Sequence, residues 1–323
     1  MSQKPFKNKL KKWIRIAAAT LLVLIIGLAA AIGLKKAHSM YWNLSGKVDY
    51  MNNLVYSMNT RMKEVENTLG NIYEHYKFDY SWAEDRHLIA HAFGGVNGAV
   101  YTNSLEAFEA NYALGHRVFE VDFDLTQPEQ TLVATHDDEQ WNKRTVNDPS
   151  VPFTYENFMN SKMDGQYTVL DYEDIINLMI QYPDIYIVTD TKYVDSPSIY
   201  LQFAQLIRCA LFKDDTVLSR IIPQIYHTDM LGQIMQMYPF ESVILTLYAT
   251  VMTPQEVADF CRETGVGFVT APMYGINQET LDLWNEQGLI VASHTSNDRE
   301  ETQELFSMGL DMMYTDFLTE EDF

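Results

Sequence analysis

The feature that most constrains the fold is a regular alternation, beyond about residue 87, of short apolar runs with longer amphipathic segments. This alternation is typical of βα units arranged around a parallel sheet. Eight such runs favour a closed (β/α)8 TIM barrel over an open doubly wound sheet, and no glycine-rich dinucleotide fingerprint follows the first run. The predicted strands are Leu88–His91, Val118–Leu125, Tyr186–Lys192, Ile221–Tyr226, Ser242–Leu247, Gly267–Ala271, Leu289–His294 and Met312–Thr315.

Local signals support this reading of the elements. The run Leu132–His136 follows the second strand too closely for a helix to fit between them, so we expect a hairpin partner. Thr253-Pro254 with Glu256 combines an N-cap, a proline at the first helical position and a capping-box acid. Asp298 with Glu301 repeats part of that signal and predicts another helix start.

Polar side chains gather at the predicted strand ends, which is where TIM barrels place their active sites. In the second strand, Glu120 and Asp122 share one face, while the alternate residues are apolar and suited to covering helices. An inward carboxylate is costly unless a cation or hydrogen bonds satisfy it. Glu120, Asp122 and Asp190, with a lysine beside them, therefore predict a site for Ca²⁺ or Mg²⁺. The remaining polar residues at predicted strand ends are His91, His136, Lys192 and His294.

Charge is distributed very unevenly along the chain. The formal net charge is −21; eight of the 23 basic residues lie in the first 36 positions, and all 44 acidic residues follow them. A body this acidic is repelled by nucleic acid and by anionic bilayer surfaces, so we expect no nucleic-acid partner.

The segment 16–34 is uncharged over 19 residues, about the length that spans a bilayer. Six basic residues precede it and two follow, so the positive-inside rule places 1–15 in the cytoplasm as a basic tail. We expect 16–34 to be a single transmembrane anchor in the cell membrane, with the rest of the chain outside the cytoplasm. A cleavable signal peptide is the alternative.

Residues 35–86 are predicted to form a membrane-proximal helical segment ahead of the barrel domain, 87–323. Within it, apolar residues recur from Val48 to Tyr76 at alternating steps of three and four, the spacing of a coiled-coil seam. This helix could pair with copies of itself, giving a homo-oligomer through 48–76, or dock its stripe on the barrel.

Several motifs, met in order along 87–317, resemble those of the glycerophosphodiester phosphodiesterases and their phospholipase C-like relatives. They are His91-Ala-Phe-Gly-Gly, Thr102-Asn-Ser-Leu-Glu-Ala-Phe, Phe119-Glu-Val-Asp, Ala134-Thr-His-Asp, Arg144-Thr, Asp190-Thr-Lys, Gln224-Ile-Tyr, His294-Thr-Ser-Asn-Asp and Thr315-Asp-Phe. The resemblance implies a barrel hydrolase with a divalent cation held by Glu120, Asp122 and Asp190, and with His91 and His136 as catalytic acid and base. We expect Lys192, Arg144 and His294 to face the substrate phosphate.

Three positions depart from the pattern of that family. Ala92 stands where the family usually has an arginine, Thr102 where it usually has a glutamate, and His294 where it has a tryptophan. The first change removes a bidentate phosphate clamp, giving a variant of the usual His-Arg-Gly motif.

The sequence therefore predicts metal-dependent hydrolysis of a glycerophosphodiester-type substrate outside the membrane. Glycerol-phosphate units of cell-wall or capsule polymers, glycerophosphodiester head groups and lysophospholipids are the candidate substrates. One alternative is an inactive, membrane-tethered barrel that serves as a binding or assembly module. A metal-independent phospholipase C-like enzyme is another, although such an enzyme should not carry so complete an acid triad.

Overall fold

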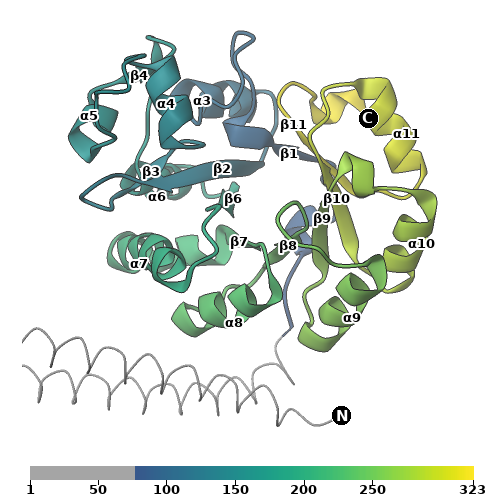
Figure 1. Ribbon diagram of the computed structural model, residues 1–323. Coiled ribbons are helices and arrows are strands. Elements are labelled where there is room, and N and C mark those ends of the chain that lie inside the picture. Colours follow the sequence, from purple (N-terminus) through teal and green to yellow (C-terminus); the bar gives the residue numbers. More distant parts are fainter. Residues whose placement is uncertain (1–76) are drawn as a thin grey trace, which may run out of the picture. The chain divides into compact units, whose positions relative to one another are not determined.

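The computed structural model describes residues 77–323, which form a closed barrel of eight parallel strands with helices outside it (Figure 1). Neighbouring strands pair in order round the barrel, and β1 closes it by pairing with both β11 and β2. The predicted (β/α)8 barrel is therefore confirmed. Its strands are β1 (Leu88–Ala90), β2 (Val118–Leu125), β6 (Tyr186–Asp190), β7 (Ile221–Ile225), β8 (Ile244–Thr246), β9 (Phe268–Pro272), β10 (Ile290–His294) and β11 (Met312–Thr315).

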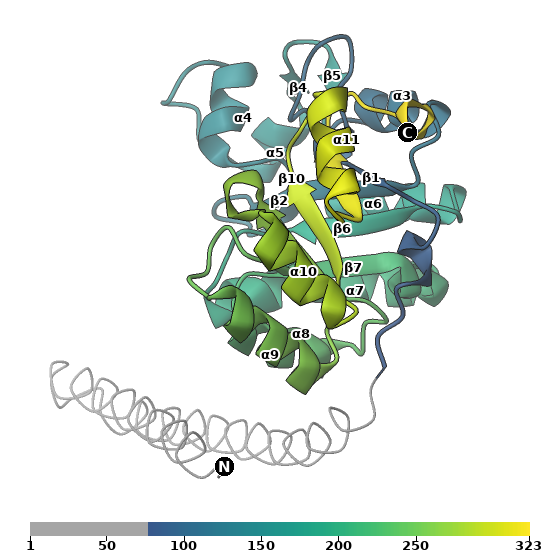
Figure 2. The same cartoon turned by 90° about the vertical axis from the view of Figure 1, so that its right-hand side faces the viewer.

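Seven helices connect successive strands and cover the barrel, as the two views show (Figures 1 and 2). Helix α9 begins with the predicted capping box, in which Thr253 and Glu256 satisfy each other's backbone N–H groups. Asp298 caps α11 as predicted, accepting from two backbone N–H groups. The helices are α3 (Leu105–Ala113), α6 (Tyr172–Gln181), α7 (Ser196–Lys213), α8 (Thr228–Met237), α9 (Pro254–Thr264), α10 (Gln278–Glu286) and α11 (Arg299–Ser307).

Alternation along β2 decides which side chains enter the barrel. Phe119, Val121 and Phe123 lie in the core between strands and helices, whereas Val118 belongs to the smaller apolar cluster inside the barrel, together with Val188 of β6. Because side chains two residues apart share a face, Glu120 and Asp122 follow Val118 into the interior. The same rule turns Asp190 inward after Val188.

Strands β1 and β6 end earlier than predicted, because the backbone turns away from the extended conformation. Strand β1 stops at Ala90, and His91 begins a 3-10 turn in which Ala92 has a φ of 50°. Strand β6 stops at Asp190, and Lys192 has a φ of 56°. A positive φ cannot continue a strand. The side chains of His91 and Lys192 therefore lie in turns just beyond strands β1 and β6.

An insertion between β2 and α6 adds a small lobe beside the barrel (Figure 1). Its first element, β3 (Leu132–Ala134), pairs antiparallel with the end of β2, which confirms the predicted hairpin. Next come the helices α4 (Asp138–Arg144) and α5 (Tyr155–Met159). A two-stranded ribbon, β4 (Lys162–Met163) with β5 (Tyr167–Thr168), completes the lobe.

The chain before β1 closes the N-terminal end of the barrel. Trp82 is buried, belongs to the interior cluster and stacks on Phe268 at a centroid distance of 5.4 Å. Its indole N–H donates to Ser242 Oγ at 2.9 Å. Residues 81–83 form one 3-10 turn. The packing of these residues differs from the predicted division at 87, because they belong to the barrel core rather than to a separate helical segment.

Trp82→Ala is expected to lower the free energy of unfolding by about 3–5 kcal/mol, because it removes a large, almost fully buried side chain from a closed barrel end. Thermal or denaturant unfolding measures the change. An unchanged melting temperature would mean that residues before β1 do not belong to the barrel core.

The predicted basic tail, the anchor at 16–34 and the heptad stripe at 48–76 lie outside the described residues. Within 77–323, no helix is both long enough and apolar enough to cross a membrane.

Candidate active site

A cavity of about 370 Å³ opens at the C-terminal ends of the strands, where the polar residues were predicted to meet. It brings together His91, Glu120, Asp122, His136, Asp190, Lys192 and His294 from five different strand ends. Arg144 is not among the residues that line it. The remaining lining residues are Tyr101, Gln224, Thr246, Tyr248, Thr295 and Tyr314.

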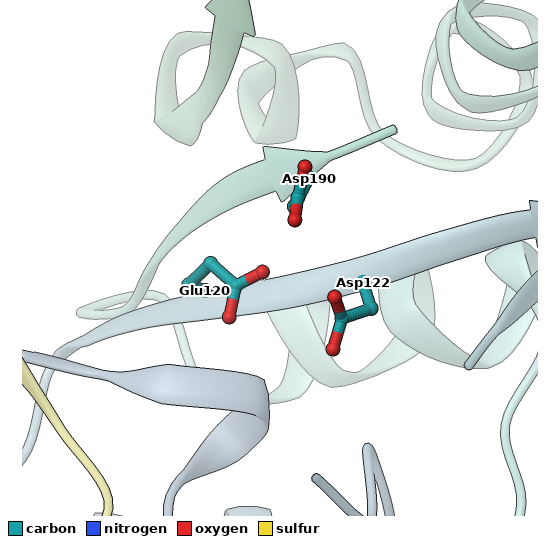
Figure 3. Close-up of side chains that lie close together, drawn as sticks. All are labelled: Glu120, Asp122 and Asp190. Carbon is teal, nitrogen blue, oxygen red and sulfur yellow. The ribbon is translucent and has the colours of Figure 1, made fainter. Parts of the chain in front are cut away.

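Three carboxylates meet in this cavity (Figure 3). Asp122 and Asp190 are register partners on the neighbouring strands β2 and β6, and Glu120 precedes Asp122 on the same face. One oxygen of each lies within 4.8 Å of the others. Two oxygens on opposite sides of Ca²⁺ would stand about 4.6–5.2 Å apart, so this spacing permits a shared cation.

Glu120 shows the electrostatic strain of this cluster. One of its oxygens accepts a hydrogen bond from the Ala92 N–H at 2.7 Å, and no residue in 77–323 donates a hydrogen bond to the other. Burial and the neighbouring charge of Asp122 raise the pKa of Glu120 to about 8. Without added positive charge, the carboxyl therefore holds a proton near neutral pH.

The other two carboxylates are held by neutral donors and by Lys192. Asp122 accepts from the Asn103 amide at 2.8 Å and pairs with the Lys192 ammonium, which also lies 3.1 Å from Asp190. Burial alone would raise the pKa of Asp122, but the charges of Lys192 and His91 outweigh it and hold this pKa below its usual range.

The residues present fit a divalent cation. All three carboxylates offer hard oxygen ligands, which Ca²⁺ and Mg²⁺ prefer. Burial and the charge of Asp122 raise the pKa of Glu120 even with Lys192 in place, so added positive charge would favour its ionised form. Glu120, Asp122 and Asp190 are therefore the residues that would hold the ion.

Tyr226 fixes the turn that carries Lys192. Its hydroxyl accepts from the backbone N–H groups of Thr191 and Lys192, at 2.8 and 3.0 Å, and donates to Asp190. Tyr248 donates to the same Asp190 oxygen at 2.9 Å. These contacts fix Asp190 and the left-handed backbone at Lys192. In this conformation the Lys192 ammonium reaches the carboxylates of Asp122 and Asp190.

The two histidines share a common arrangement. His91 Nδ1 donates to Asp316 at 3.0 Å, and His136 Nδ1 donates to Asp137 at 2.5 Å. Neither Nε2 makes a hydrogen bond with another residue in the described part of the chain, and both rings line the cavity. A carboxylate on one nitrogen fixes the ring and leaves the other nitrogen free for proton transfer.

The carboxylate partner of His91 is itself held in place. Asn297 donates its amide to Asp316 at 2.8 Å and accepts the Asp316 backbone N–H at 2.7 Å. Burial lowers the pKa of His91, but the hydrogen bond to Asp316 and the charges of Glu120 and Asp122 outweigh it. The net result raises that pKa to about 9.

His294 has the opposite electrostatics. Burial, together with the charge of His91, lowers the pKa of His294 to about 4, so its imidazole is neutral near pH 7. Its Nε2 is buried and contacts no hydrogen-bonding partner in 77–323. The ring meets Tyr248 and Tyr314 edge-on. It therefore lines the cavity as an uncharged polar group.

Arg144, predicted to face the phosphate, is directed elsewhere. Its guanidinium pairs with Asp164 and donates to the backbone carbonyls of Val100 and Tyr101, at 2.7 and 2.9 Å. These contacts hold the side chain at the loop behind the cavity rather than in it. Arg144 therefore does not face the cavity, contrary to the expectation that it binds the phosphate.

Sequence reasoning did not assign roles to several residues that shape the cavity. Asp316 lies in a quoted motif, Thr315-Asp-Phe, and so does Asn103, but neither motif shows by itself which side chain the residue contacts. Asp137 follows His136 directly, and from the sequence this position suits either a residue that orients the histidine or an exposed loop acid. Tyr101 precedes the Thr102 motif and carries no signal of its own.

Comparison with known proteins supports the same reading. The Glycerophosphoryl diester phosphodiesterase family matches residues 95–320. No curated protein matches the chain.

Solved structures with similar folds include a glycerophosphodiester phosphodiesterase from Parabacteroides distasonis, at 18% identity and a TM-score of 0.58, covering 73% of this chain and 94% of that one. A phosphodiesterase from Oleispira antarctica, solved with its product sn-glycerol-3-phosphate, has 17% identity and a TM-score of 0.58, covering 72% and 93% of the two chains. At these identities the likeness establishes the barrel. The match over residues 95–320 establishes more: the chain belongs to the glycerophosphoryl diester phosphodiesterase family, whose members are phosphoric diester hydrolases.

Proposed function

We propose that this barrel hydrolyses a glycerophosphodiester-type substrate in a reaction that depends on a divalent cation. One observation carries the proposal: three inward carboxylates and two carboxylate-held histidines open on a single cavity. Ca²⁺ and Mg²⁺ both suit the oxygen ligands.

Proton transfer falls to the two histidines. A cation at the three carboxylates would neutralise phosphate charge as it develops in the transition state. The raised pKa of His91 keeps it protonated, so its Nε2 gives a proton to the leaving alkoxide as the P–O bond breaks. His136 Nε2 takes the proton of the attacking hydroxyl, from the glycerol unit or from water, as the new P–O bond forms. Lys192 supplies a second positive charge at the cavity wall.

If a glycerol hydroxyl attacks first, the product is a cyclic phosphate, which water then opens with the histidine roles reversed. The resemblance to phospholipase C-like enzymes supports this two-step route.

This assignment predicts an alkaline loss of activity. A general acid works only while protonated, so kcat/KM should fall as pH rises through the pKa of His91, at or below about 9 because a bound cation adds positive charge nearby. Asp316→Asn removes the carboxylate that raises this pKa and should move the alkaline limb to lower pH. A profile from about pH 6 to 10 at saturating cation measures both. If the wild type and Asp316→Asn lose kcat/KM at the same alkaline pH, His91 is not the general acid.

We also propose that the enzyme is a single-pass membrane protein with its barrel outside the cytoplasm. The uncharged segment 16–34 and its basic flanks support this orientation. In that location the candidate substrates are glycerol-phosphate units of cell-wall or capsule polymers and lipid head groups.

The inactive binding module has one specific observation in its favour, which is Ala92 in place of the usual arginine. Its methyl group is fully buried and its N–H is already donated to Glu120, so position 92 offers no side-chain contact to a phosphate. The intact carboxylate triad and histidine pairs favour the enzyme.

Phosphorus NMR of the full chain with sn-glycero-3-phosphocholine tests the proposal. We expect a phosphomonoester or cyclic phosphate to appear with the wild-type protein and not with the His91→Ala/His136→Ala double variant. An unchanged diester signal with this and other glycerophosphodiesters would favour the binding module.

A further inference from the structure

Tyr101 lies between the two catalytic histidines. Its ring meets His91 edge-on at a centroid distance of 4.4 Å and His136 edge-on at 5.6 Å, each at an interplanar angle of 82°. Edge-to-face contacts at these distances are favourable and fix the relative ring orientations. Tyr101 also lines the cavity, so it touches both proton-transfer groups and the space that the substrate would enter.

The hydroxyl of Tyr101 is free to bind a ligand. It makes no hydrogen bond with any residue in 77–323, and it is not among the buried polar atoms without a partner. Burial and the nearby charges of Asp122 and Asp316 raise its pKa to about 12, so the O–H remains a donor at neutral pH.

The loop that carries Tyr101 is held by hydrogen bonds from Arg144 to its backbone. Arg144, at the end of α4, donates to the carbonyls of Val100 and Tyr101. Its guanidinium also pairs with Asp164, in the turn between β4 and β5. Tyr101 has a φ of 54°, a conformation that a bulky residue adopts only when its surroundings impose it. The lobe between β2 and α6 thus supplies the clamp that places this ring.

We propose that Tyr101 is a substrate-binding residue that donates its hydroxyl hydrogen bond to a non-bridging phosphate oxygen, and that Arg144 is the residue that positions it. This proposal rests on the proposed function and deepens it. Ala92 offers no donor to the cavity, and Lys192 is shared between two carboxylates, so a neutral donor beside the histidines completes the phosphate contacts.

Tyr101→Phe removes only the O–H and keeps the ring between the histidines. A hydrogen bond to a charged oxygen predicts a loss of about 10- to 100-fold in kcat/KM on sn-glycero-3-phosphocholine. It also predicts weaker binding of sn-glycerol 3-phosphate, measured by calorimetry on the full chain with cation present. Unchanged affinity for sn-glycerol 3-phosphate would overturn the proposal, whatever happens to kcat/KM.

Arg144→Lys tests the clamp, since the single lysine nitrogen cannot reproduce a bidentate pair with Asp164 while a separate nitrogen donates to the two carbonyls. We expect it to weaken sn-glycerol 3-phosphate binding in the wild-type background and to add little in the Tyr101→Phe background, because both changes remove the same contact. Equal losses in both backgrounds would show that Arg144 does not act through Tyr101.

The binding measurement separates this proposal from the function on which it rests. If the wild type turns over substrate and Tyr101→Phe does not change the affinity for sn-glycerol 3-phosphate, the hydrolase proposal stands. The proposal that Tyr101 binds the phosphate is then wrong. Absence of turnover in the wild type would refute the hydrolase, while loss of phosphate affinity in Tyr101→Phe would still place Tyr101 at the phosphate.

Discussion

Replacing either His91 or His136 with alanine is expected to lower kcat on a glycerophosphodiester by about 10²–10⁴, the usual contribution of a positioned acid or base. Both rings line the cavity, and each has its Nδ1 held by a carboxylate, so each is set to move a proton through Nε2. Product affinity should change little, because neither histidine is proposed as the main phosphate contact. Steady-state kinetics with calorimetric product binding measure both quantities.

The double variant sharpens this prediction. Since the two histidines act in one proton-transfer cycle, their combined loss should be far smaller than the product of the single losses. Thr253→Ala, in the exposed capping box of α9, is a matched control that should cost about 1 kcal/mol of stability and no activity. If His91→Ala retains full activity, the two-histidine mechanism is wrong.

Removal of the cation should have a comparably large effect. Three buried or half-buried carboxylates repel one another, and a bound divalent ion replaces that repulsion with attraction. At about 100 times its Kd, Ca²⁺ or Mg²⁺ should stabilise the fold by about 2.7 kcal/mol, which corresponds to roughly 5–10 °C in melting temperature for a domain of this size.

Glu120→Gln should abolish this thermal shift and lower kcat by about three orders of magnitude or more, since removing one ligand weakens the cation that neutralises the phosphate. Without cation, the variant should be no less stable than the wild type at pH 7, because the raised pKa of Glu120 already favours its neutral form. Asp184→Asn, which loses a surface pair with Arg117, is the control and should keep the shift. A full cation-induced shift in Glu120→Gln would contradict the assigned ligands.

The barrel and the carboxylate triad could be predicted because both follow from local periodicity. Apolar runs set the strands, and the alternation of Phe119, Val121 and Phe123 with Glu120 and Asp122 determines which side chains enter the interior. Strand order in a barrel then brings Asp190 beside Asp122, since neighbouring parallel strands align their carboxyl ends.

The remaining features depend on contacts between distant segments, which periodicity does not encode. Arg144 belongs to the Arg-Thr motif, yet its partners lie 20 residues ahead at Asp164 and more than 40 behind at Val100. Asp316 reaches His91 across 225 residues. The left-handed backbone at Ala92 and Lys192 could not be predicted, because neither position holds the glycine that usually signals it. Trp82 looked like part of a helical segment because nothing local shows that it packs inside the barrel.

The most direct test of the central claim is hydrolysis of sn-glycero-3-phosphocholine by the full 323-residue chain, with and without a chelator. We predict that glycerol phosphate is released by the untreated protein, that chelation stops this release and that millimolar Ca²⁺ or Mg²⁺ restores it. Turnover that continues undiminished in the chelated protein would contradict a cation-dependent site at Glu120, Asp122 and Asp190.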